Sequence, residues 1–208
     1  MATLELWLVR HARPLVEPGV CYGRLDVPAD PAHTAASAQA LAAALQAAPQ
    51  PAPTLPVWAS PRTRTWALAN ALATLAPVGL SMQAPRADER LAEMDFGHWE
   101  GRRWDTLPRA ELDAWTNDFH HHRPGGGENV AGFLARVRAA LDDCHRQAQA
   151  LGARRAVWVT HAGVVRAVQV WLAQTPQPLR AQDWPTAACD FGAWEVRHWP
   201  DLAAPLVK

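Results

Sequence analysis

The sequence has no excess of charge of either sign. Lys and Arg together number 20, and Asp and Glu also number 20, so the chain has no net field that would hold a polyanion. This balance argues against nucleic acid and against anionic membrane surfaces as partners. We therefore expect a small ligand.

Cysteine and long apolar runs are also scarce. The three cysteines are odd in number and form no C-x-x-C pair, which argues against a disulfide framework and a zinc cluster and favours the cytoplasm. The first apolar run, residues 4–9, is short and contains Glu5, unlike a secretory signal. No run approaches the roughly 20 residues of a membrane-spanning helix.

The order of the expected elements indicates an α/β protein. A chain of 208 residues with 49% hydrophobic content can bury a full core, so we expect one domain over residues 1–208. Short buried strands alternate with helices, which predicts a single three-layer α/β/α domain with a mostly parallel central sheet. The strands are expected at residues 4–9, 56–59 and 156–159, the helices at 34–47, 60–76, 130–151 and up to 172, and a terminal hairpin at 187–199, hinged at Gly192.

Polar side chains follow each of the three expected strands. Arg10 and His11 come after the first, a stretch from Ser60 to Arg64 after the second, and His161 after the third. Ser60 also has the form of a helix cap. Ligands bind at the carboxyl ends of strands in open α/β sheets, so these groups are predicted to share one pocket. A lone His or Arg at such a position is more often a surface residue, but three sites together weaken that interpretation.

The residue types in this pocket predict an anionic ligand. Arg10, Arg64, His11 and His161 have no evident carboxylate partner at the strand ends and would repel one another unless an anion lay between them. Guanidinium groups match phosphate oxygens bidentately. The residues themselves therefore indicate a phosphate site.

Four motifs in this order resemble those of the histidine phosphatases, also called phosphoglycerate-mutase-like proteins. The family's Arg-His-Gly stands here as Arg10-His11-Ala12, and its Ser-Pro-x-x-Arg as Ser60-Pro61-Arg62-Thr63-Arg64. Its Glu-x-x-Phe-Gly-x-Trp-Glu-Gly corresponds to residues 93–101, and its Thr-His-Gly-Gly to Thr160-His161-Ala162-Gly163. Each motif alone is a weak signal, but all four in the family's order are specific and imply a phosphoglycerate-mutase-like fold.

Two departures from the family pattern are visible. The glycine that follows each motif histidine is alanine here, at Ala12 and Ala162, and we expect this small side chain to be tolerated without loss of activity. Glu17 stands where mutase-like members often carry a neutral polar residue near phosphate. This departure affects one secondary contact to phosphate.

The loops around the motifs look most like those of α-ribazole phosphatases in cobalamin biosynthesis. The similarity lies in residues 11–14, 21–28, 95–97 and 124–128. It implies a phosphatase acting on α-ribazole 5′-phosphate. Related broad-specificity small-molecule phosphatases share these stretches, so that alternative stays open.

The resemblance also implies roles for individual residues. His11 would be the nucleophile that becomes a phosphohistidine, while Arg10, Arg64 and His161 hold the phosphoryl oxygens. The two arginines should also disfavour an imidazolium and keep His11 neutral. The residues that the resemblance assigns to substrate binding are Arg10, Arg64, His161, Tyr22 and Ala162.

The motif match selects Glu93 as the acid that protonates the leaving group and then takes a proton from water. Asp95 and Glu89 are the nearest substitutes, and Asp88 and Glu100 are expected to be solvated or structural. Because fixed cations can supply the charge that Mg²⁺ usually provides, no metal or other cofactor is expected.

Two other sequence features invite interpretations that we set aside. Adjacent residues cannot all face one ion, so His120-His121-His122 is predicted to be a solvated loop rather than a metal site, with a place at the pocket mouth left open. Gly125-Gly126-Gly127 has no preceding strand and no Lys-Ser/Thr ending, which indicates a turn rather than a nucleotide-binding loop.

Two competing functions remain. A phosphoglycerate mutase would use the same pocket, although the chain is shorter than the bisphosphoglycerate-dependent mutases and residues 95–101 resemble the phosphatase branch. A catalytically silent phosphate-binding protein would need neither a nucleophile nor an acid. The expected partner is a small phosphorylated metabolite, and the oligomeric state is open, a homodimer included.

Overall fold

The computed structural model describes residues 3–48, 54–75 and 79–200, and its centre is one five-stranded sheet in the order β3-β2-β4-β1-β5. The strands are β1 (Leu4–Arg10), β2 (Val57–Ala59), β3 (Arg86–Ala87), β4 (Arg155–Thr160) and β5 (Trp194–Trp199). β1, β2, β3 and β4 pair in parallel, and β5 runs antiparallel to β1 at one edge. The predicted mostly parallel sheet is confirmed.

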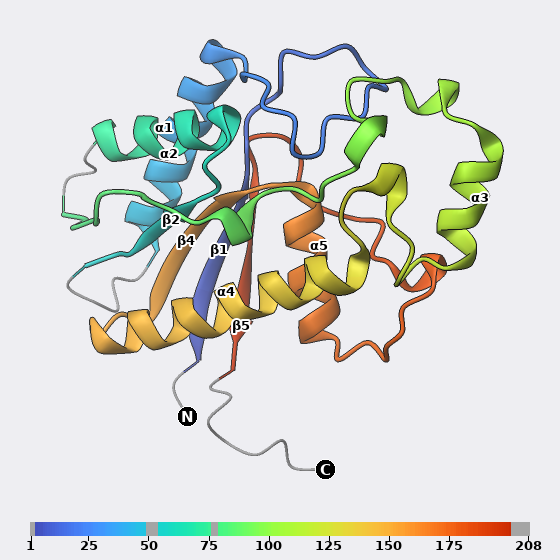
Figure 1. Cartoon of the computed structure of the whole chain (residues 1–208). Coiled ribbons are helices and arrows are strands. Elements are labelled where there is room, and N and C mark those ends of the chain that lie inside the picture. Colours follow the sequence, from blue (N-terminus) through green and yellow to red (C-terminus); the bar gives the residue numbers. More distant parts are fainter. Residues whose placement is uncertain (1–2, 49–53, 76–78, 201–208) are drawn as a thin grey trace.

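Helices cover both faces of the sheet (Figure 1). The α-helices are α1 (Pro31–Ala47), α2 (Thr63–Leu75), α3 (Arg109–Asn117), α4 (Val130–Ala150) and α5 (Ala162–Leu172). Short 3-10 helices lie at Glu89–Leu91, Gly97–Trp99, Trp104–Thr106, Pro124–Gly126 and Ala181–Asp183. Core side chains of α1 and α2 pack on one face and those of α4 and α5 on the other, whereas α3 lies away from the sheet. This arrangement is the predicted three-layer α/β/α domain.

The interior strand β1, which lies between β4 and β5, is buried on both faces. Leu4, Leu6 and Leu8 pack on the side of α4 and α5, while Trp7 and Val9 pack on the side of α1 and α2. A strand covered on both faces reads as a continuous apolar run rather than an alternating one, as it does here. The core therefore fixes the strand whose carboxyl end carries the first motif.

Capping residues set the helix boundaries. α1 begins three residues before the predicted start because the Asp30 side chain accepts hydrogen bonds from the Ala32 and His33 N–H groups, with Pro31 in the first turn. The long helix α4 is confirmed: Asn129 caps its start, and Gly152, with a φ of 66°, follows its end. Within the described residues, no helix has both the length and the apolar composition that a membrane crossing needs.

The predicted terminal hairpin is wrong. Residues 193–199 do contain a strand, but β5 pairs with β1 from Leu4 and Trp199 to Val9 and Trp194. Residues 187–191 form no strand and instead pass the carboxyl end of β1, where the Gly192 N–H donates to the carbonyls of Arg10 and His11. β5 thus pairs with β1, whereas the local sequence pattern had predicted that it would pair with residues 187–191.

Candidate active site

A pocket of about 120 Å³ lies at the carboxyl end of β1. It is lined by Arg10, His11, Val20, Tyr22, Gly23, Glu93, Phe96, Trp104 and Ala162. Because β1, β4 and β2 are adjacent and parallel, the residues that follow them meet at one edge of the sheet. Of the groups predicted to share one pocket there, Arg10 and His11 line it, whereas Arg64 and His161 do not. Arg64 and His161 have no exposed surface and are buried alongside His11.

His11 is held as a neutral imidazole with a defined tautomer. Its side chain is 2% exposed, and Nδ1 lies 2.7 Å from the Ala12 carbonyl oxygen, which can only accept a hydrogen bond. Burial, followed by the charges of Arg64 and Arg10, lowers the pKa of His11 to about 3. The proton therefore sits on Nδ1, and Nε2 keeps its lone pair.

His161 lies against His11 with the ring centroids 5.2 Å apart. Burial and the charge of Arg64 lower the pKa of His161 well below its ordinary value. Its Nε2 is 2.9 Å from the Ser60 hydroxyl oxygen, and its buried Nδ1 has no hydrogen-bond partner among the described residues. The predicted helix start at Ser60 is wrong, because α2 begins at Thr63; the Ser60 hydroxyl accepts a hydrogen bond from the Arg62 N–H at 3.4 Å and also lies beside His161.

Neutral groups hold the two pocket arginines. The Nη1 and Nη2 atoms of Arg64 each donate to a backbone carbonyl at 2.7 Å, those of Leu25 and Gly23. The Arg10 guanidinium lies 3.8 Å from the centre of the Phe191 ring and donates to a backbone carbonyl. Carbonyl oxygens and aromatic rings carry no net charge, so both cations keep their full charge for an anion.

Backbone amides hold the carboxylate of Glu93. The Gly163 N–H donates to Oε2 at 3.0 Å, and the Met94 N–H donates to Oε1 at 3.0 Å. A Cβ at Gly163 would overlap the Glu93 carboxylate, so a larger residue there would displace that carboxylate from its present place. Glu93 thereby reaches the first turn of α5, directly after His161.

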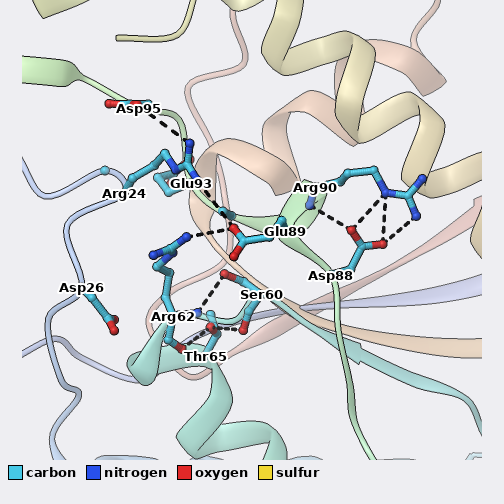
Figure 2. Close-up of polar contacts among 12 residues, drawn as sticks. Arg24, Asp26, Ser60, Arg62, Thr65, Asp88, Glu89, Arg90, Glu93 and Asp95 are labelled. Carbon is cyan, nitrogen blue, oxygen red and sulfur yellow. Dashed lines mark hydrogen bonds and ion pairs between the residues drawn. The ribbon is translucent and has the colours of Figure 1, made fainter.

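The other carboxylates between residues 88 and 100 have structural partners. Asp88 and Glu89 form ion pairs with arginines, as Figure 2 shows. Asp95 accepts a hydrogen bond from a backbone N–H, and Glu100 accepts three. Of these carboxylates, only Glu93 lines the pocket.

Sequence reasoning missed the aromatic wall of the pocket. The Phe191 ring lies 5.5 Å from that of His11, and Phe96 and Trp104 meet edge to face at 5.2 Å. Phe96 belongs to the motif at residues 93–101, but nothing in the sequence marks Phe191, which the expected hairpin placed in a strand. Its position depends on the long-range pairing of β5 with β1.

The histidine run after α3 is only partly solvated. His121 is exposed, but His120 is 6% exposed, so the prediction of a solvated loop is wrong for that residue. The three side chains do not line the pocket beside His11. Across the described residues no group of three or more His, Cys, Asp or Glu is placed to hold a metal ion. Residues 125–127 form a turn, as predicted, and Glu17 is exposed.

The buried neutral His11 should make the protein less stable in acid. Its pKa is about 3 in the fold against an ordinary 6.5, so the unfolded chain binds more protons between these values and stability falls as the pH falls below 6.5. The loss is about 2 kcal/mol of unfolding free energy for this histidine between pH 7 and pH 5. Urea denaturation at both pH values should show a smaller loss, by about that amount, in His11→Asn. Parallel losses in the two proteins would contradict the neutral state of His11.

Comparisons with known proteins agree with this geometry. The model of the histidine phosphatase superfamily (branch 1) matches residues 6–199. A phosphoglycerate mutase from Thermus thermophilus is 32% identical, with a TM-score of 0.62, and the match covers 95% of this chain and 94% of that one. Protein TTHB049 of the same organism is 31% identical, with a TM-score of 0.61 and 95% of each chain covered.

A third similar structure has a different description. It is a protein from Escherichia coli str. K-12 proposed to be an alpha-ribazole-5′-P phosphatase; it is 25% identical, with a TM-score of 0.70, and the match covers 94% of this chain and 90% of that one. No curated protein matches the chain.

Proposed function

Because the chain belongs to the histidine phosphatase superfamily (branch 1), we propose that it is a metal-independent phosphomonoesterase that works through a phosphohistidine on His11. The observation that carries this proposal is the state of His11: a neutral ring whose Nδ1–H is bound to a carbonyl, leaving Nε2 unprotonated in the same pocket as Glu93. A neutral imidazole nitrogen is a nucleophile, whereas an imidazolium is not.

The first step transfers the phosphoryl group to the enzyme. His11 Nε2 attacks phosphorus, the bond from phosphorus to the ester oxygen breaks, and the departing alkoxide takes a proton from Glu93. Arg10, Arg64 and His161 stabilise the negative charge on the phosphoryl oxygens. Catalysis of phosphoryl transfer consists mostly of such charge stabilisation together with positioning of the substrate. Low dielectric around Arg64 and His161, which are fully buried, strengthens that stabilisation.

The second step returns the enzyme to its starting state. The Glu93 carboxylate accepts a proton from water while the water oxygen attacks the phosphohistidine, so inorganic phosphate leaves and His11 becomes neutral again. One carboxyl group thus serves as acid and then as base. Its two backbone N–H donors keep it in place for both steps.

A phosphoglycerate mutase is the second candidate function. The likeness to the mutase from Thermus thermophilus, at 32% identity over nearly the whole chain, favours it. A mutase would transfer the same phosphoryl group to a second substrate hydroxyl instead of water. Phosphate release measured with and without bisphosphoglycerate separates the two functions, because only the mutase depends on that compound.

For the substrate we propose α-ribazole 5′-phosphate, a nucleotide with an aromatic base. The pocket supports it through the rings of Tyr22, Phe96 and Trp104, which give it an aromatic, partly apolar lining beside the site of phosphoryl transfer. The likeness to the Escherichia coli protein is a second support. Tyr22 and Ala162 line this pocket with His11 and would contact the substrate there.

A panel of phosphomonoesters tests this substrate class. We expect α-ribazole 5′-phosphate to be hydrolysed with a kcat/KM at least tenfold above that of simple sugar phosphates, because stacking on an aromatic ring contributes about 1 kcal/mol or more per contact. A flat profile over the panel would refute the substrate.

Turnover should be undiminished in excess chelator, because the proposed mechanism uses no metal ion. Activity that disappears with chelator and returns with Mg²⁺ or Zn²⁺ would refute the metal-independent mechanism.

A further inference from the structure

The guanidinium of Arg136, on α4, forms hydrogen bonds with the backbone of the segment that carries Glu93. Arg136 Nη1 donates to the carbonyls of Arg90 and Ala92 at 2.7 and 2.8 Å, and Nη2 donates to the carbonyl of Glu93 at 3.1 Å. Nε and Nη2 also form a bidentate pair with the Glu128 carboxylate at 2.7 and 2.9 Å. All three guanidinium nitrogens therefore donate, in a side chain that is 20% exposed.

Glu128, the partner of Arg136, binds the backbone on the other side of Glu93. The Glu128 N–H donates to the carbonyl of Asp95 at 2.8 Å, so the Arg136–Glu128 pair holds the backbone both before and after the proposed acid. α4 itself packs on the sheet through its buried face, which makes it a fixed base for this pair. Only arginine has enough donors in a fixed plane for this set of contacts, since the ammonium of lysine is a single point with three donors.

We propose that Arg136 is a positioning residue for general-acid catalysis, an inference that rests on the proposed function of Glu93. Arg136 does not line the pocket, and it acts through the backbone of residues 90–93 by fixing where the Glu93 carboxylate stands. A displacement of about 1 Å in a reacting group can cost on the order of 10²-fold in rate. Loss of the Arg136 hydrogen bonds should therefore slow mainly the step in which Glu93 donates its proton to the leaving group.

A matched control lies two residues further along the same helix. Arg138 is also half-buried and pairs with Asp142, and its guanidinium lies 5.2 and 5.3 Å from the ring centres of Trp171 and Trp199. It lines a separate hollow of about 380 Å³ that holds none of the proposed site residues. Arg138→Lys therefore removes a guanidinium from α4 without touching the Glu93 segment.

The test compares Arg136→Lys with Arg138→Lys on two substrates by rapid quench. With an alkyl phosphate, whose leaving group needs a proton, Arg136→Lys should slow phosphoryl transfer by about 10- to 100-fold. With nitrophenyl phosphate, whose leaving group does not, the same variant should lose less than about threefold. Arg138→Lys should keep both rates. In a Glu93→Gln background, Arg136→Lys should add almost no further loss for the alkyl ester, because the group that it positions has gone.

Amide hydrogen exchange gives a readout independent of activity. The Gly163 N–H binds the Glu93 carboxylate, so it should exchange faster in Arg136→Lys than in Arg138→Lys, while the urea midpoints of the two variants stay similar. Equal losses on both substrates, a full additional loss in the Glu93→Gln background, or unchanged Gly163 exchange would each overturn the positioning role. Failure of the unsubstituted protein to release phosphate from any ester would instead contradict the proposed function, and the exchange measurement would still decide whether Arg136 positions Glu93.

Discussion

A His11→Ala variant is expected to hydrolyse alkyl and aryl phosphates at a rate on the order of 10⁴- to 10⁶-fold below that of the unsubstituted protein. Removal of the nucleophile lowers the rate of other enzymes by about this factor. The loss should not depend on the leaving group, since in the proposed mechanism both kinds of ester transfer their phosphoryl group to His11. His11→Asn, which keeps more of the buried volume, should lose as much. Agreement between the two variants separates the chemical role of the ring from its packing.

The intermediate itself can be trapped. On rapid quench with a labelled substrate, the unsubstituted protein should carry a phosphoryl group that is stable in base and labile in acid, as expected of a phosphohistidine. Neither His11 variant should be labelled. A labelled His11→Ala protein would move the nucleophile elsewhere, first to His161, whose ring lies 5.2 Å away and whose Nδ1 has no partner among the described residues.

The Glu93→Gln variant should show an effect that depends on the substrate. An alkyl phosphate must expel a strongly basic alkoxide, so its transfer should slow by about 10²- to 10⁴-fold, the range that general acid catalysis supplies. Nitrophenyl phosphate expels a stabilised phenolate, and its transfer step should lose far less. Since Glu93 also activates water in the proposed mechanism, the phosphoenzyme should accumulate, visible as a burst of nitrophenol followed by slow turnover.

The outcome that opposes this assignment is an equal slowing of the burst phase for both substrates. Glu93 would then act in binding or folding rather than as an acid. The alternatives from the sequence were Asp95 and Glu89, but the structure places neither of them in the pocket lining. Asp95→Asn is therefore a suitable control, and we expect it to keep the dependence on the leaving group close to that of the unsubstituted protein.

The layers of the fold could be predicted because each long element carries its own pattern. The apolar run of β1 and the spacing on α4 reflect burial, which is local information in a chain that alternates strands and helices. β3 is two residues long and shows no period, so it was missed. The hairpin failed for another reason: the choice of β1 as the partner of β5 is a tertiary contact that no window of residues 187–199 contains.

The part of the candidate site that lies at the ends of strands could be predicted from the sequence. Arg10, His11 and His161 follow buried strands, and the topology brings them together. Selecting Glu93 needed the family resemblance, because Glu93 does not follow one of the three predicted strands and its carboxylate is held by the N–H of the distant Gly163. Phe191 carried no signal at all, since it reaches His11 only after residues 187–191 pass across the end of β1.

The contact between Gly163 and Glu93 limits which sequences this pocket can tolerate. Two small residues near the phosphate site, Ala12 and Ala162, already carry a methyl group where the family pattern has glycine, so the backbone there has room to vary. At Gly163 the volume of a methyl group is already filled by the carboxylate oxygen. In the proposed mechanism, a methyl group at Gly163 would displace the Glu93 carboxylate and so act on proton transfer rather than on phosphate binding.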